Sequence, residues 1–84
     1  MADAATLARI RWRCRRGMVE LDVLLLRFLD QSWPTVSDTE RSLFLRLLDC
    51  EDDNLWRWFM GITGPDDKDL DGLVARIRAL PPRA

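Results

Sequence analysis

The chain has 84 residues, 48% of them hydrophobic, which suffices for one small domain and leaves little room for a second. Its formal net charge of -1 argues against a general binder of polyanions. The chain has no histidine, so zinc would lack its usual nitrogen ligand and catalysis its usual general base. The composition predicts a thin core without a large cofactor pocket, a catalytic residue or a metal site.

The first segment combines an apolar helical face with a series of arginines. Leu7, Ile10 and Cys14 share one face of a helix, and this helix is expected to end near Arg16. The charges are distributed unevenly, because carboxylates crowd the second half of the chain. The arginines of the first segment are Arg9, Arg11, Arg13, Arg15 and Arg16.

Gly17 follows this basic last turn, which is typical of a helix C-terminus, because glycine adopts a positive φ without a steric penalty. A second helix is expected to begin at about Met18, with Glu20 in its first turn, where a carboxylate faces the positive end of the helix dipole. Its apolar stripe has the spacing i, i+3, i+4, i+7 and consists of Leu21, Leu24, Leu25 and Phe28.

Pro34 interrupts the helical pattern and predicts a loop over residues 31–36. Ser37 and Glu40 then have the spacing of a capping box, in which the serine oxygen accepts the amide three residues on and the glutamate reaches back. A third helix is therefore expected from Asp38 to about Leu48. It should bury Leu43, Phe44, Leu47 and Leu48.

The acidic residues 51–53, followed by Asn54, suit the start of a fourth, short helix, which carries Leu55, Trp56, Trp58, Phe59 and Met60. A fifth helix should begin at Asp66 or Asp67 and end before Pro81, with a frayed tail from about residue 80. Its apolar stripe is Leu70, Leu73, Val74 and Ile77. The sequence thus predicts an all-α, compact five-helix bundle that forms a single domain over residues 1–84.

Cys14 and Cys50 are interpreted as small buried residues of a reducing compartment, since two cysteines form neither a disulfide framework nor a metal cluster. Residues 1–6 lack the basic flank and apolar run of a signal peptide. No stretch approaches the ~20 apolar residues of a membrane span. A soluble, cytoplasmic protein is expected.

Two functional interpretations follow from composition, and both stay open at this point. The basic first helix, with Trp12 among its arginines, fits a nucleic-acid-binding surface. The 4 tryptophans fit a helical adaptor that binds another protein, since tryptophan and arginine are enriched at binding hot spots. Trp56 and Trp58 lie about 200° apart on a helix, so at least one of them should be partly exposed.

The stretch Arg16-Gly17-Met18-Val19-Glu20 carries a more specific signal. Preceded by residues 10–15 and followed by Leu21-Asp22, it resembles the signature of the succinate dehydrogenase assembly factor family, the flavinylation factors. Residues 47–52, and Leu55 together with residues 58–60, extend the resemblance over nearly the whole chain.

The resemblance implies a five-helix assembly factor, not an enzyme. Such a protein binds the flavoprotein subunit of succinate dehydrogenase, and in bacteria often that of fumarate reductase, and promotes covalent attachment of FAD. It implies a cytoplasmic monomer that holds no cofactor stably and binds no nucleic acid. The histidine that accepts the flavin must belong to the partner, because this chain has none.

The resemblance also implies where the partner docks. The motif carries over to Arg16, Gly17 and Glu20, and the surrounding docking residues are expected to be Arg15, Met18, Asp22 and Trp12. In this interpretation the glycine corner between the first two helices presents Arg16 and Glu20 outward.

Overall fold

Five α-helices make up the fold, in a computed structural model that describes residues 4–82. No strand occurs within these residues, so the predicted all-α class is confirmed. The helices are α1 (Ala4–Arg13), α2 (Val19–Gln31), α3 (Asp38–Leu48), α4 (Asp52–Phe59) and α5 (Lys68–Ala79).

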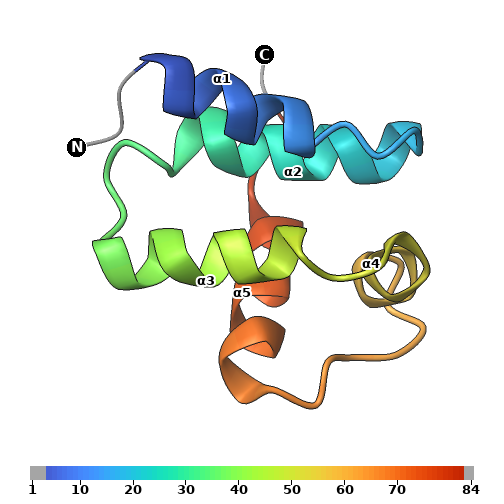
Figure 1. Cartoon of the computed structure of the whole chain (residues 1–84). Helices are drawn as coiled ribbons and strands as arrows, with labels where there is room; N and C mark the ends of the chain where they lie inside the picture. Colours follow the sequence, from blue (N-terminus) through green and yellow to red (C-terminus); the bar gives the residue numbers. More distant parts are fainter. Residues whose placement is uncertain (1–3, 83–84) are drawn as a thin grey trace.

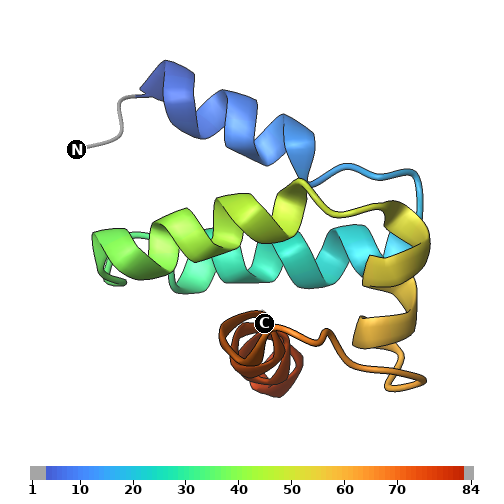
Figure 2. The ribbon, with the colours of Figure 1, turned by 60° about the horizontal axis from the view of Figure 1, so that its bottom comes forward.

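α2 and α3 lie side by side and run in opposite directions, and α5 crosses both of them (Figure 1). The short α4 closes one end of this pair. Figure 2 shows that α1 stands away from α3 along most of its length and approaches it only at the end where α1 leads toward α2. We call α2 to α5 the body of the molecule.

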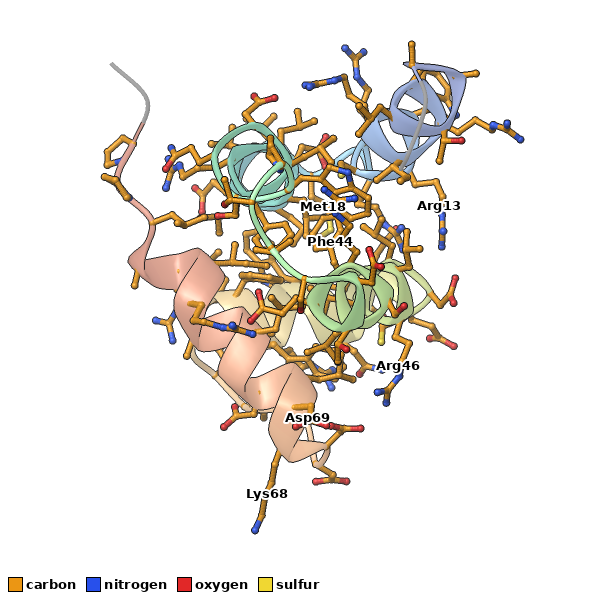
Figure 3. All side chains as sticks on the ribbon, turned by 90° about the vertical axis from the view of Figure 1, so that its left-hand side faces the viewer. Arg13, Met18, Phe44, Arg46, Lys68 and Asp69 are labelled. Carbon is orange, nitrogen blue, oxygen red and sulfur yellow. The ribbon has the colours of Figure 1, made fainter. Side chains whose placement is uncertain are left out.

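The core of the body lies between α2, α3 and α5. Phe44 is completely buried, stacks on Phe28 with 4.5 Å between ring centroids, and meets Trp33 edge-on at 6.0 Å. Figure 3 shows Phe44 in the space between α2 and α3. The predicted stripes of α2 and α5 face this core, although Leu24 is only half-buried, as is Leu43 of α3, which was expected to be buried.

Side-chain caps fix the starts of α3 and α5. The hydroxyl of Ser37 accepts the Glu40 amide at 3.2 Å, as the capping box predicts, but the Glu40 carboxylate pairs with Arg76 of α5. Asp67 accepts the amides of Asp69 and Leu70 at 2.8 and 3.2 Å. The predicted bounds of α3 are confirmed, and α5 begins one residue after the predicted start.

The first two helices differ from the prediction at their junction. α1 ends at Arg13, not near Arg16, and α2 begins at Val19. Residues 14–18, which we call the corner, turn the chain instead, and Gly17 has the expected positive φ of 81°. The physical reason for the early end of α1 is the set of bonds that Arg16 makes, described below.

The segment after α5 returns to α2. Arg27 and Gln31 donate hydrogen bonds to the carbonyl oxygens of Leu80 and Pro81 at 3.4 and 2.8 Å. Fraying was predicted from about residue 80, and residues 83–84 of that tail lie outside the described part of the chain. Residues 1–3, where the sequence shows no signal-peptide pattern, also lie outside it. Among the described helices, none is long and apolar enough to cross a membrane.

Candidate functional site

Four helix ends meet at one end of the molecule, and the predicted docking motif lies there. The corner joins the C-terminus of α1 to the N-terminus of α2, and residues 49–51 join α3 to α4 beside it (Figure 1, right-hand end). Gly17 provides the turn through its positive φ. The motif is therefore placed where two connections from distant parts of the sequence run next to each other.

Arg16 links these two connections. Its Nε donates to Oδ1 of Asp52 at 2.6 Å, in the first turn of α4. Its Nη1 donates to the Leu48 carbonyl at 2.9 Å and to the Arg13 carbonyl at 3.2 Å, and its Nη2 donates to the Cys50 carbonyl at 2.9 Å. Only 17% of the side chain is exposed. We call this set of bonds the Arg16 clamp.

The clamp supplies hydrogen-bond donors to carbonyl groups at the ends of helices. The last carbonyls of an α-helix have no partner within the helix and carry the negative end of its dipole. Arg13 and Leu48 are the last residues of α1 and α3, so a single guanidinium serves both C-termini. The prediction that the corner presents Arg16 outward is wrong, because the planar donor fork of arginine is used inside the molecule.

Asp22 and Met18 also turn toward the protein. The Asp22 carboxylate accepts the Arg16 main-chain amide at 2.7 Å, and the Asp22 amide bonds to the Met18 carbonyl at 2.9 Å. Met18 is half-buried and packs against the core. Asp22 thus fastens the corner to α2 from one side while the Arg16 side chain fastens it to α3 and α4 from the other.

The remaining predicted docking residues lie on the surface. Glu20, Gly17 and Arg15 are exposed, and Trp12 is 71% exposed. A Cβ added to Gly17 would meet no atom within 4 Å, so the outer side of the corner is open. Their part in binding a partner stays a prediction.

The arginines of α1 are largely engaged within the protein. Arg11 pairs with Asp30 of α2 at 2.7 Å, and Arg13 pairs with Asp49 after α3. With Arg16 in the clamp, Arg9 and Arg15 are left over from the series, and they do not form a continuous basic face. Most of the positive charge on which the nucleic-acid interpretation depends is therefore paired within the protein.

The cysteines do not form a reactive site. Burial raises the pKa of the Cys14 thiol to about 11, although Arg11, Arg16 and Arg13 lower it in part. Burial, followed by the charge of Asp49, raises the pKa of Cys50, whose thiol lies 3.5 Å from the Arg46 carbonyl. Both stay protonated near neutral pH, and both are free. Within residues 4–82, no group of three or more potential ligands could hold a metal ion.

Sequence reasoning missed two features of this end of the molecule. Asp52 was explained by the dipole of its own helix, whereas it also receives the Arg16 side chain. Val19 and Val23 were not singled out, yet they are 78% and 47% exposed on α2 next to the corner. The sequence signal for this exposed apolar surface was the presence of two valines in the second helix outside its predicted apolar stripe.

The chain was compared with known proteins. Residues 8–81 match a family model described as the flavinator of succinate dehydrogenase. A relative named FAD assembly factor from Xylella fastidiosa is 52% identical over 81 residues, covering 96% of this chain and 84% of the relative.

Two further relatives carry the same name. The protein from Shewanella oneidensis is 49% identical over 76 residues, covering 90% of this chain and 93% of its own length. The protein from Pseudomonas putida is 45% identical over 77 residues, covering 92% of each. These names describe an assembly factor and not a catalyst. With the family model matched over nearly the whole chain, this protein belongs to the family of succinate dehydrogenase flavinators.

Proposed function

We propose that this protein is an assembly factor that binds the flavoprotein subunit of succinate dehydrogenase, and also that of fumarate reductase, and promotes covalent attachment of FAD. The family membership and the names of the relatives support this proposal. The observation that carries it is an exposed Gly17 and Glu20 on a corner fastened to four helix ends. The protein acts in the cytoplasm as a monomer.

The flavin bond forms on the partner. The chain has no histidine, so the accepting imidazole belongs to the flavoprotein, as does the FAD. The assembly factor binds more tightly to the conformation in which the flavin and this imidazole meet, and so raises its population. Holding two groups in a reactive geometry lowers the barrier without any proton transfer by the assembly factor.

The site residues divide into two roles. Glu20, Gly17, Arg15 and Trp12 contact the partner: the carboxylate pairs with a cation, and the glycine allows close approach of the partner backbone. Arg16, Asp22 and Met18 position these residues from inside the protein.

The test is to co-express the flavoprotein subunit with variants of this chain and to read covalent flavin by in-gel fluorescence. Glu20→Gln and Gly17→Val are expected to reduce flavinylation strongly. Asp38→Asn is the matched control, because Asp38 is also an exposed carboxylate in the first turn of a helix and lies at the opposite end of α3 from the corner (Figure 1). Full flavinylation in the absence of this protein, or with folded Glu20 and Gly17 variants, contradicts the proposal.

A second measurement addresses the cofactor. The isolated protein, titrated with free FAD, is expected to leave flavin fluorescence unchanged, because the flavin is held by the partner. Stoichiometric quenching of the fluorescence by this protein alone would show instead that it carries FAD to the flavoprotein.

A further inference from the structure

A shallow apolar groove runs along the outer side of α2, next to the end of α4. It has a volume of about 300 Å³ and begins directly after the corner. Leu24 and Met60 form its half-buried floor, and Glu20 lies on its rim. The lining residues are Val19, Glu20, Val23, Leu24, Arg27 and Met60. We call this surface the α2–α4 groove.

Two of its apolar side chains are exposed to water. Val19 is 78% exposed and Val23 is 47% exposed, one helical turn apart. Single exposed apolar residues are ordinary on protein surfaces, but adjacent ones around a hollow are typical of a binding surface. A second hollow of about 280 Å³, lined in part by Leu26 and Pro82, shares Val23 and Arg27 with the groove. The apolar surface therefore continues along α2.

The charge on the rim is unbalanced at the end nearest the corner. Glu20 is exposed, and no residue between positions 4 and 82 forms an ion pair with it. Arg27, at the other end, is partly engaged through its bond to the Leu80 carbonyl. An occupant thus meets apolar side chains along the groove and a free carboxylate at its start.

We infer that the α2–α4 groove receives an apolar anchor of the flavoprotein subunit, a large aliphatic or aromatic side chain followed by a lysine or arginine that pairs with Glu20. This inference rests on the proposed function and extends its docking surface beyond the motif, to Val19, Val23 and Met60. Buried apolar anchors flanked by charge pairs are typical of binding hot spots. The groove is continuous with the corner, so one partner segment covers both.

A second copy of this chain fits the groove less well. A stable dimer buries roughly 800 Å² on each partner. The groove consists of one face of α2 and the Met60 side chain after α4, so two copies that meet groove to groove share only a narrow strip. A larger partner that also covers the corner reaches the required area.

The experiment measures binding of the purified flavoprotein subunit, loaded with FAD, to immobilised variants of this protein. Val23→Glu places a charge in the groove at an exposed helical position and is expected to weaken binding roughly tenfold or more. Ala75→Glu, which adds the same charge to an exposed position of α5, is the control and should bind like the wild type. Thermal unfolding verifies that both variants are folded.

A photo-crosslinking side chain at position 23 then identifies the occupant. The expected product joins this protein to a flavoprotein peptide that contains a large apolar residue beside a lysine or arginine. Wild-type affinity of Val23→Glu, together with a strong reduction of flavinylation by Glu20→Gln, overturns the inference and leaves the proposed function standing. Flavinylation independent of this protein overturns both. A crosslinked dimer of this chain, with a sedimentation shift lost in Val23→Glu, assigns the groove to a second copy and also overturns the inference.

Discussion

The two ends of the molecule are held together by different kinds of contact. Between α2, α3 and α5 the contacts are apolar, with Phe44, Leu47 and Leu73 completely buried. At the end where α1 joins, α1 itself buries only Ile10, and ion pairs and the Arg16 clamp hold it in place. Apolar packing supplies stability in proportion to buried area, whereas directional hydrogen bonds define one geometry.

This difference fits the position of the predicted docking motif at the polar end. The bonds at the corner hold Gly17 and Glu20 at fixed positions, because such bonds fail when the backbone moves by an ångström. The body, in contrast, tolerates side-chain adjustments as long as its volume remains filled.

The largest effect is expected from Phe44→Ala in the body. Removing a completely buried ring that contacts Phe28 and Trp33 should lower the free energy of unfolding by about 3–5 kcal/mol. Because so small a domain is only marginally stable, circular dichroism should show the variant largely unfolded even at low urea concentrations. Phe44→Leu should lose much less. A loss below about 1 kcal/mol for Phe44→Ala would contradict the assignment of the core.

Arg16→Ala tests the clamp. It leaves the Leu48 and Cys50 carbonyls without their donor, and we expect a loss of about 2–3 kcal/mol in the free energy of unfolding. Arg16→Lys should recover only part of it, since an ammonium cannot reproduce the planar fork. Hydrogen exchange should increase first at residues 14–18. Unchanged stability together with lost flavinylation would show that Arg16 is a docking residue and that the clamp does not hold the polar end together.

Gly17→Ala tests the turn itself. A positive φ of 81° costs a residue with a Cβ about 1–2 kcal/mol, and no neighbouring atom adds a clash. The expected decrease is about 1 kcal/mol, which corresponds to roughly 4–8 °C in the melting temperature of a domain of this size. Gly17→Asn should lose less, because asparagine tolerates this region of φ. Equal losses of stability for both variants would indicate that the added side-chain volume, and not the positive φ of the backbone, causes the loss.

Arg11→Ala should have a small global effect. Its pair with Asp30 is exposed, with 50% of the arginine side chain open to water, so about 0.5 kcal/mol or less is expected, and less still at high salt. Locally, however, the amides of α1 should exchange faster while those of α3 stay protected. Uniformly faster exchange in all helices would show that α1 unfolds only with the body.

The smallest effect concerns pH and Asp67. The hydrogen bond from Arg46 holds the pKa of this carboxyl below its ordinary value, with help from the amides of Leu70 and Asp69. A lowered folded-state pKa contributes stability that is present above the unfolded value of about 4 and is lost as the pH falls through the folded value. Urea titrations from pH 7 to acid should show that the free energies of unfolding of wild type and Asp67→Asn become more similar as the pH falls. A difference in the free energy of unfolding that instead grows toward acid would show that the pKa of Asp67 is raised, not lowered, in the folded protein.

Much of the body could be predicted from the sequence because its signals are local. Ser37 and Pro34 define the start of α3, and the stripe of α5 has helical spacing within a single segment. The clamp could not be predicted, since Arg16 bonds to residues 32 to 36 positions away, two of them through main-chain carbonyls that carry no sequence signal. The end of α1 was placed too late for the same reason.

The α2–α4 groove was also beyond the sequence. Val19 and Val23 carry apolar side chains, as the core residues do, and their sequence does not show that Met60, after α4, completes a hollow beside them. The identity of the motif, by contrast, depends on a few residues in fixed order. The resemblance therefore predicts a site at these residues, but it does not give the orientation of Arg16.

The clamp makes the protein sensitive to loop length more than to side-chain identity. Three of its four acceptors, at positions 13, 48 and 50, are backbone carbonyls, so these residues can be exchanged without removing the acceptor. A single residue inserted between Leu48 and Asp52 would instead shift the carbonyls and the carboxylate out of register with the guanidinium. The spacing of the α3–α4 connection thus helps to fix the geometry of the predicted docking motif, although it lies more than thirty residues from that motif.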